Sequence, residues 1–282
     1  MKKIIILFFF FVYTVTHAQS PGWAWAKGVG GNQGQSPSYN YQTIGYNLIT
    51  DANGNVYSVG TGESSSMVVG AYTLTNADNT GATPNLFIIK YDALGNVLWA
   101  KSAIGNFGYN LSVTIDAASN IYITGGFSSQ TITFDAQTLT KNGTEGMNDI
   151  FIAKYSSLGN FIWAKTYGGN NDDNGNAITV DAANNFYITG NFNSSSLNIN
   201  AYTITHDSST NANMFIAKFD SSGNALNAKS VGKSCTIAIP GNNIITDNNN
   251  NVYVTGAYTN NIVYIGQDTL FCNSNSYNSF VI

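Results

Sequence analysis

The chain has 282 residues, more acidic than basic side chains, and few charges of either sign. Lysine supplies all 11 basic residues because arginine is absent, and only 9% of the residues are charged against about 25% in an average protein. A pI near 4.9 without arginine argues against a nucleic-acid binder, since phosphate and base contacts need clustered cations. A hydrophobic content of 43% argues against global disorder.

The N-terminus has the three-part layout of a secretory signal peptide. Lys2 and Lys3 precede an apolar run, 4–15, and small residues flank His17 at the positions where signal peptidase cuts. A transmembrane helix is the alternative, but the run is shorter than the roughly 20 residues needed to span a bilayer. We therefore expect residues 1–18 to be removed after Ala18, leaving no transmembrane segment and a protein that is secreted or held at the cell surface.

A ten-residue segment recurs along the chain with a period of 65, 65 and 66 residues. Its copies begin at Asp51 (DANGNVYSVG), Asp116 (DAASNIYITG), Asp181 (DAANNFYITG) and Asp247 (DNNNNVYVTG). Four copies in one register identify a repeat protein, in which each repeat is one structural unit. The Asp, Asn and Gly residues predict tight turns between short strands.

A second element keeps the same period. It runs from Phe87 through Lys90 to Trp99, and it returns around Lys154 and Trp163; in the third copy Asn227 replaces the Trp. This element predicts a second hairpin in each repeat. The variable stretch between the hairpins always ends alike, as in YTLT at 72–75, which predicts an extra edge strand or hairpin. No window has a sustained helical period.

Four or more short antiparallel strands in each repeat of about 65 residues, without helices, predict an all-β fold made of β-propeller blades. A β-solenoid is the competing architecture, but its repeats are usually much shorter. The recurring Gly60, Gly125, Gly190 and Gly256 would allow a close backbone approach within each blade.

The combined motifs resemble the secreted bacterial β-propeller repeat often called SBBP. The pattern D-A-x-G-N-x-Y-x-x-G followed by F-x-A-K-Y-D-x-x-G-N-x-x-W-A-K covers residues 22–282, nearly all of the mature chain. The resemblance implies exported, often surface-associated bacterial proteins, frequently with a type IX sorting domain. It implies no shared catalytic residues and no cofactor.

The repeat boundaries divide residues 19–282 into one propeller domain. Residues 22–31 match only the last strand of a first blade; whole repeats cover about 44–105, 106–169 and 170–232, and 233–282 is a partial repeat. We expect an incomplete propeller that is part of a longer one. In the alternative, a strand at 23–29 pairs with 280–282 and closes a four-bladed ring.

Catalytic and ligand-binding residues are scarce in this pattern. Asp172-Asp173 is the only adjacent acidic pair, and we interpret it as a solvated loop rather than a pair of glycosidase carboxylates. His206 is the one mature histidine and is interpreted as an ordinary loop residue. Trp99 and Trp163 recur at fixed strand positions, which favours packing over sugar stacking, and Tyr39 and Tyr41 are not grouped into a site.

Two weak metal candidates and one disulfide candidate remain. Oxygen-bearing side chains alternate in two of the repeat turns, as in the first half of a calcium loop, although the acidic ligand that ends such a loop is missing. These candidates are Asp51, Asn53, Asn55, Asp247, Asn249 and Asn251. Cys235 and Cys272 could form a disulfide or remain free thiols, since spacing alone does not decide pairing.

The sequence therefore predicts an exported, non-enzymatic β-propeller that serves as a binding or structural module for an unknown protein or glycan ligand. The alternative is the propeller part of a secreted glycan-active hydrolase or lectin whose active region lies outside this chain.

Overall fold

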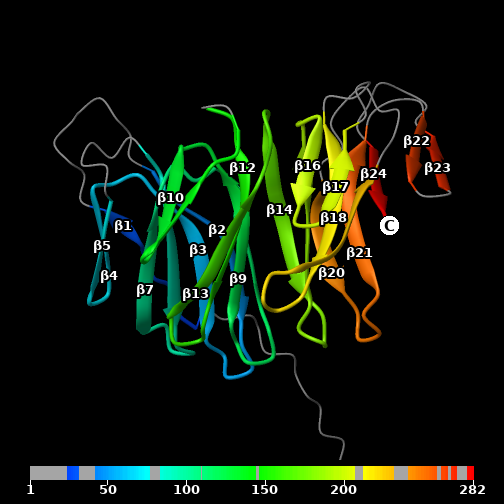
Figure 1. The fold of residues 1–282 in the computed structure, drawn as a ribbon. Helices are drawn as coiled ribbons and strands as arrows, with labels where there is room; N and C mark the ends of the chain where they lie inside the picture. Colours follow the sequence, from blue (N-terminus) through cyan, green and yellow to red (C-terminus); the bar gives the residue numbers. More distant parts are fainter. Residues whose placement is uncertain are drawn as a thin grey trace, which may run out of the picture.

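The computed structural model describes residues 24–31, 42–76, 83–108, 110–143, 146–206, 212–231, 241–258, 262–265, 268–271 and 278–282. Among these residues the regular structure consists of β-strands, which pair antiparallel with their neighbours (Figure 1). The predicted all-β class is confirmed. Within the same ranges there is no helix of the length and apolarity needed to cross a bilayer.

Four blades follow one another along the chain, and the strands of each blade pair in the order in which the chain forms them. Blade 1 contains β2 (Thr43–Thr50), β3 (Val56–Gly62), β6 (Asn85–Tyr91) and β7 (Val97–Ile104). Blade 2 contains β8 (Ser112–Ile115), β9 (Ile121–Phe127), β12 (Asp149–Tyr155) and β13 (Phe161–Tyr167). Blade 3 contains β14 (Asp173–Val180), β15 (Phe186–Phe192), β18 (Asn213–Phe219) and β19 (Ala225–Val231). The described strands of blade 4 are β20 (Gly241–Thr246), β21 (Val252–Tyr258) and β24 (Asn278–Val281).

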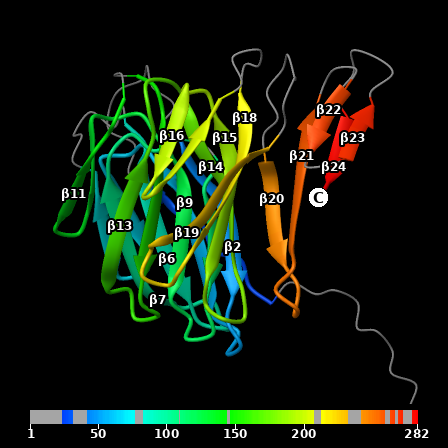
Figure 2. The same ribbon diagram turned by 45° about the vertical axis from the view of Figure 1, so that its right-hand side comes forward.

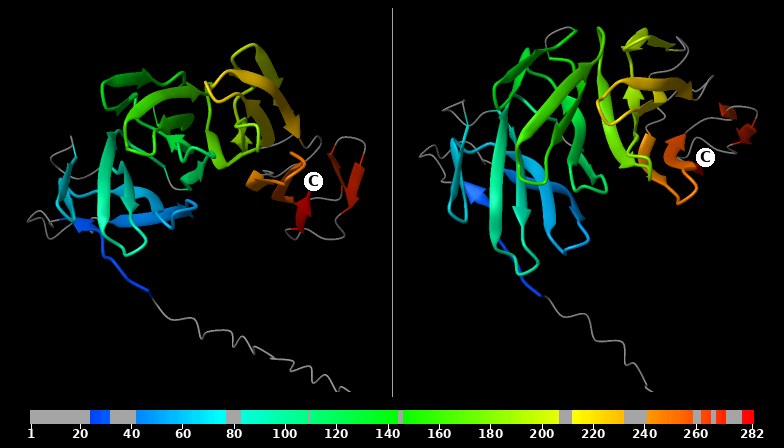
Figure 3. Two further views of the ribbon diagram at one scale, coloured as in Figure 1. Left: turned by 90° about the horizontal axis from the view of Figure 1, so that it is seen from below. Right: turned by 60° about the horizontal axis from the view of Figure 1, so that its bottom comes forward.

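The blades are arranged in an open arc (Figure 3). The first strands of successive blades, β2, β8, β14 and β20, are neighbours and form the inner side of the arc. Blade 4 lies at one flank with the C-terminus beside it (Figure 2), and no described strand of blade 1 pairs with it. The fold is therefore an incomplete β-propeller, and the closed four-bladed alternative is not formed by the described residues.

Each variable stretch forms the predicted hairpin, and two of these hairpins reach back to the preceding unit. The hairpin of blade 2, β10 (Thr131–Phe134) with β11 (Gln137–Thr140), pairs with the outer strand β7 of blade 1. In the same way β4 (Ser66–Val69) with β5 (Tyr72–Thr75) pairs with β1 (Gly30–Gly31). The remaining hairpins are β16 (Ser196–Ile199) with β17 (Tyr202–Thr205), and β22 (Ile262–Ile265) with β23 (Asp268–Phe271).

The hydrophobic core is divided among the junctions between blades. Separate buried clusters join blade 1 to blade 2, blade 2 to blade 3, and blade 3 to blade 4. Alternating side chains let each sheet bury both faces against its two neighbours. The glycine of the repeat motif allows the first two strands of a blade to approach closely: a Cβ at Gly60 would lie 2.1 Å from the Ile44 carbonyl oxygen, and one at Gly190 would lie 1.9 Å from that of Asn174. This agrees with the predicted close approach.

The repeat Asp holds its turn together. Asp51 Oδ1 accepts hydrogen bonds from the backbone N–H groups of Asn53 (2.9 Å) and Asn55 (3.0 Å). Asp51 Oδ2 accepts hydrogen bonds from the Asn55 amide (2.8 Å) and the Tyr57 hydroxyl (3.0 Å). These contacts lower the pKa of Asp51 despite the opposing effect of burial. The same bonds recur at Asp181, which explains the spacing of Asp, Asn and Tyr in the motif.

Where the repeat Trp is present, it contacts the second turn of the following blade. The Trp99 ring packs on Gly159, in the second turn of blade 2, and its Nε1 donates to the Ser157 carbonyl at 3.2 Å. Trp25 lies in the same way on Gly95 of blade 1, and Trp163 on Gly223 of blade 3. The prediction that these rings serve packing is confirmed for Trp99, which is buried in the core between blades 1 and 2.

The Lys of the second motif adds another link in the same direction. The ammonium of buried Lys90 donates to the Ser157 carbonyl at 3.0 Å, and that of Lys154 donates to the Ser221 carbonyl at 2.9 Å. Each ammonium also lies over the ring of the repeat Tyr, with Lys90 at 4.8 Å from the Tyr57 centroid. A buried cation is thus satisfied by a turn carbonyl and an aromatic face.

Candidate functional site

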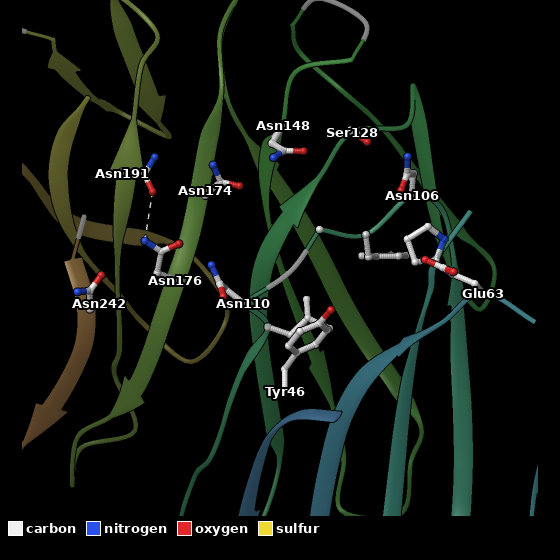
Figure 4. A pocket seen from close by; sticks show the side chains of 14 residues that line it. Tyr46, Glu63, Asn106, Asn110, Ser128, Asn148, Asn174, Asn176, Asn191 and Asn242 are labelled. Atoms are coloured by element: carbon white, nitrogen blue, oxygen red, sulfur yellow. Dashed lines mark hydrogen bonds between the residues drawn. The ribbon is translucent and has the colours of Figure 1, made fainter. Parts of the chain in front are cut away.

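A polar pocket lies on the inner side of the arc, at the end of the inner strands opposite the repeat turns. Its volume is about 920 Å³, and all four blades or the loops beside them contribute to it. Figure 4 shows Asn110, Asn176 and Asn242 on one side of the pocket and Glu63 and Asn106 on the other. The lining consists of Tyr46, Glu63, Pro84, Asn106, Phe107, Gly108, Asn110, Leu111, Ser128, Asn148, Asn174, Asn176, Asn191 and Asn242.

One position of the repeat supplies a lining residue from every blade. The ladders between the first and second strands are irregular at Tyr46, Asn176 and Asn242, where an extra residue bulges out of the inner strand. Each bulged residue lines the pocket and lies five positions before the repeat Asp. Leu111 has the same spacing in blade 2. In blades 1, 3 and 4 the bulge therefore directs one variable side chain towards a common space.

The pocket is rich in side-chain amides, most of which make no hydrogen bond to a described residue. Seven asparagines line it. The Asn176 amide is engaged, since it donates to Asn191 Oδ1 at 3.2 Å and to the Gly241 carbonyl at 3.1 Å, and so joins blades 3 and 4. The other lining amides make no hydrogen bond to a described residue; these belong to Asn106, Asn110, Asn148, Asn174 and Asn242.

Charge is nearly absent from the lining. Glu63 is the one charged side chain among the described lining residues, and it accepts a hydrogen bond from the Gln42 N–H at 3.1 Å. Tyr46 borders the pocket with a partly buried ring that also packs on the core between blades 1 and 2. The pocket thus combines amide donors and acceptors with the aromatic rings of Tyr46 and Phe107.

The acidic pair Asp172-Asp173 is not a solvated loop, so that interpretation was wrong for Asp173. Asp173 is fully buried at the start of β14. Its carboxylate accepts hydrogen bonds from the Gly169 N–H (2.9 Å), the Ser194 hydroxyl (2.7 Å), and the N–H groups of Asn193 (3.1 Å) and Ser194 (3.2 Å). These donors replace water, although burial still raises the pKa of Asp173. The pair therefore anchors loops beside the pocket.

Asp149 is a second buried carboxylate close to Asp173. Burial, with a smaller effect from the charge of Asp173, raises the pKa of Asp149 to about 6, against the hydrogen bond from the Asn142 N–H and the charge of Lys141. Its Oδ2 accepts the Asn142 N–H at 2.8 Å, whereas Oδ1 is buried without a hydrogen bond. Asp149 is the first residue of the third strand of its blade; the other blades begin that strand with Asn85, Asn213 and Asn278.

The calcium candidates lie in the repeat turns, away from the pocket. Asp247 Oδ1 accepts the N–H groups of Asn249 (2.9 Å) and Asn251 (2.8 Å), as Asp51 does in blade 1. Both turns are thus held by hydrogen bonds within themselves, and the calcium proposal for them stays a prediction. Among the described residues no three His, Cys, Asp or Glu side chains are grouped closely enough to hold a metal ion.

Several other predicted features lie outside the described residues. These are the signal peptide at 1–18, Tyr39, Tyr41, and the disulfide candidates Cys235 and Cys272. His206 is described: its ring lies edge-on to Phe192, with centroids 5.8 Å apart.

Comparison with known proteins supports a propeller-like repeat protein. The chain is 30% identical over 210 residues to an uncharacterized WD repeat-containing protein of Acanthamoeba polyphaga mimivirus. The match covers 65% of this chain but only 14% of that relative, so the chain spans a small part of the relative's length. No family model matches the sequence.

The asparagine pocket is the feature that sequence reasoning missed. The repeat motifs draw attention to residues shared by all blades, whereas the pocket is lined at positions that differ from blade to blade. The signal was present in the register: the residue five places before each repeat Asp is Tyr46, Leu111, Asn176 or Asn242.

Proposed function

We propose that the chain is an exported, non-enzymatic β-propeller that binds a ligand outside the cell or at its surface. The observation that carries this proposal is the pocket of about 920 Å³, with its unpartnered amides, on the inner side of the arc. A concave site with converging polar groups is the usual form of a ligand site. The similarity to a WD repeat-containing protein supports a propeller used for binding.

Assignment to the secreted bacterial SBBP group and export both follow from the sequence motifs. The Asp-to-Gly and Trp-Ala-Lys motifs support the group, and the basic, apolar and small-residue segments of 1–18 support export. A cell-surface or secreted location is the consequence of that export.

The lining supports binding rather than hydrolysis. Most glycosidases use two carboxyl groups that flank the scissile bond, and the described lining has the single carboxylate of Glu63. The buried Asp149 and Asp173 are engaged in loop contacts instead. In the alternative, the chain is the propeller part of a secreted hydrolase or lectin whose active region lies elsewhere. The same pocket would then be an accessory binding site.

Two measurements on the whole chain test the proposal. Expression of residues 1–282 in a Gram-negative host should give an exported product whose mass corresponds to a chain that starts at Gln19. A cytoplasmic product that retains Met1 would contradict export. The mature protein should then bind a ligand from an array of glycans and extracellular proteins, and Asn242→Ala should weaken that binding. Release of sugar products from a polysaccharide by the mature chain would favour the hydrolase alternative.

A further inference from the structure

We infer that the ligand of the pocket is an uncharged carbohydrate, a short neutral oligosaccharide. This inference rests on the proposed binding function and assigns the ligand's chemistry. Three properties of the pocket lead to it: the kind of polar group, the charge, and the aromatic surface.

The amides of the pocket suit a ligand with hydroxyl groups better than a ligand whose groups only donate or only accept hydrogen bonds. An Asn side chain offers two N–H donors and a carbonyl acceptor, and a sugar hydroxyl both donates and accepts. Asn106, Asn110, Asn148, Asn174 and Asn242 are free to make such bonds because no described residue uses them. Asn106, Asn148 and Asn174 are partly buried, whereas Asn110 and Asn242 are exposed. A ligand that hydrogen-bonds the partly buried amides supplies partners that the described protein does not.

The charge distribution argues against an anionic ligand. Recognition of phosphate, sulfate or carboxylate groups relies on Arg or Lys, and neither is among the described lining residues. The one charged side chain among those residues is the carboxylate of Glu63, which repels anions and can accept hydrogen bonds from hydroxyl groups. The nearby lysine, Lys141, is buried and donates to the carbonyls of Ser128 (3.2 Å) and Met147 (2.7 Å), so it is turned to the protein.

Tyr46 brings an aromatic ring to the pocket lining. It occupies the bulge of β2 and lies in the pocket between the amide side and Glu63 (Figure 4). An aromatic ring with one apolar face and a polar tip suits ligands that are apolar on a face and polar at the edge. The volume of about 920 Å³ is near the upper end of the roughly 300–1,000 Å³ of small-molecule sites, which suits a short oligosaccharide better than one sugar.

The test is titration calorimetry of the mature chain after a glycan array has chosen the probes. The neutral probes are cello-, xylo-, manno- and chito-oligosaccharides; the anionic probes are oligogalacturonates and hyaluronan fragments. We expect at least one neutral probe to bind with an affinity that does not change between low and high salt, because no ionic contact is made.

Variants of the pocket locate the binding. Asn242→Ala and Asn110→Gly each delete one amide and should raise Kd about 2- to 10-fold; glycine is chosen at 110 because Asn110 has a φ of +76°. Tyr46→Ala should weaken binding, and Tyr46→Phe should retain most of it. The matched control is Asn160→Ala, an exposed Asn in the second turn of blade 2 whose side chain makes no described hydrogen bond.

Each outcome bears on the inference. Binding of only anionic glycans, or of a protein, that weakens in the pocket variants would overturn the inference while the proposed binding function stands. Neutral glycans that bind with unchanged Kd in all three pocket variants bind elsewhere and overturn it too. If no probe on the glycan and protein arrays binds through the pocket, both proposals fail. Each variant is used only if its melting temperature stays close to that of the parent.

Discussion

Replacing Gly159 by Ala should destabilise the junction between blades 1 and 2 through the Trp99 ring. Gly159 has a φ of +79°, and a Cβ built there would lie 2.9 Å from Trp99 Cδ2. Two costs follow: a non-glycine residue in the left-handed region loses about 1–2 kcal/mol, and an overpacked contact loses about 1–3 kcal/mol.

Gly146 separates the two costs. Its φ is +85°, but a Cβ there would meet no described atom within 4 Å. Gly146→Ala should therefore lose only the backbone cost, and both variants share the same gain from a less flexible unfolded chain. The free energy of unfolding should be lower for Gly159→Ala than for Gly146→Ala by about 1–3 kcal/mol.

Urea denaturation of the mature chain, followed by circular dichroism, measures this difference. Adding Trp99→Ala, which alone should cost about 3–5 kcal/mol, completes a double-mutant cycle. Without the indole ring, Gly159→Ala should cost no more than Gly146→Ala. Equal losses for the two glycine variants in the presence of Trp99 would refute the proposed contact between blades.

Three further predictions concern other parts of the fold. Asp149→Asn should be more stable than the parent above pH 6 by about 3 kcal/mol, and the two proteins should be equally stable below pH 4. The reason is that the pKa of Asp149 is about 6 in the folded protein and lower in the unfolded chain, so the parent loses stability as the pH rises between these values. Melting curves from pH 4 to 7 check this, and a difference that does not vary with pH would contradict it. Trp25→Ala should cost less than Trp99→Ala in urea denaturation because Trp25 is partly exposed and its contacts among the described residues are with blade 1, including Tyr91 at 5.5 Å between ring centroids. A larger loss would argue for a closed ring. Calcium should leave the melting temperature unchanged, since donors already occupy both oxygens of Asp51; a calcium-dependent rise that Asp51→Asn abolishes would reverse this conclusion.

The blade could be predicted from the sequence because the residues that build it recur. Asp51 and its counterparts hold the same turn in each repeat, and local hydrogen bonding explains their spacing without any tertiary information. The role of Trp99 as a packing residue followed from its fixed position in a strand. Its partner Gly159 lies in another repeat, so that contact required the arrangement of neighbouring blades.

The candidate site could not be predicted in the same way. Its amides come from loops and bulges that are far apart in the chain, and only the arc brings Asn110 near Asn242. The solvated-loop interpretation of Asp173 failed because local polarity does not show that Ser194 and neighbouring N–H groups enclose the carboxylate. Whether the arc is open or closed depends on the strand with which the N-terminal segment pairs. The repeat pattern is compatible both with a closed ring, in which 23–29 pairs with 280–282, and with an open arc; in the structure Gly30–Gly31 pairs with β4.

A crystal structure of the mature chain soaked with the neutral oligosaccharide that binds it best would test most directly whether the pocket is a sugar site. We expect electron density for the sugar in the pocket between Tyr46 and Asn242, with its hydroxyl groups within hydrogen-bond distance of the lining amides. Density for the sugar on another face of the propeller, with this pocket free of it at saturating concentration, would show that the pocket is not the sugar site.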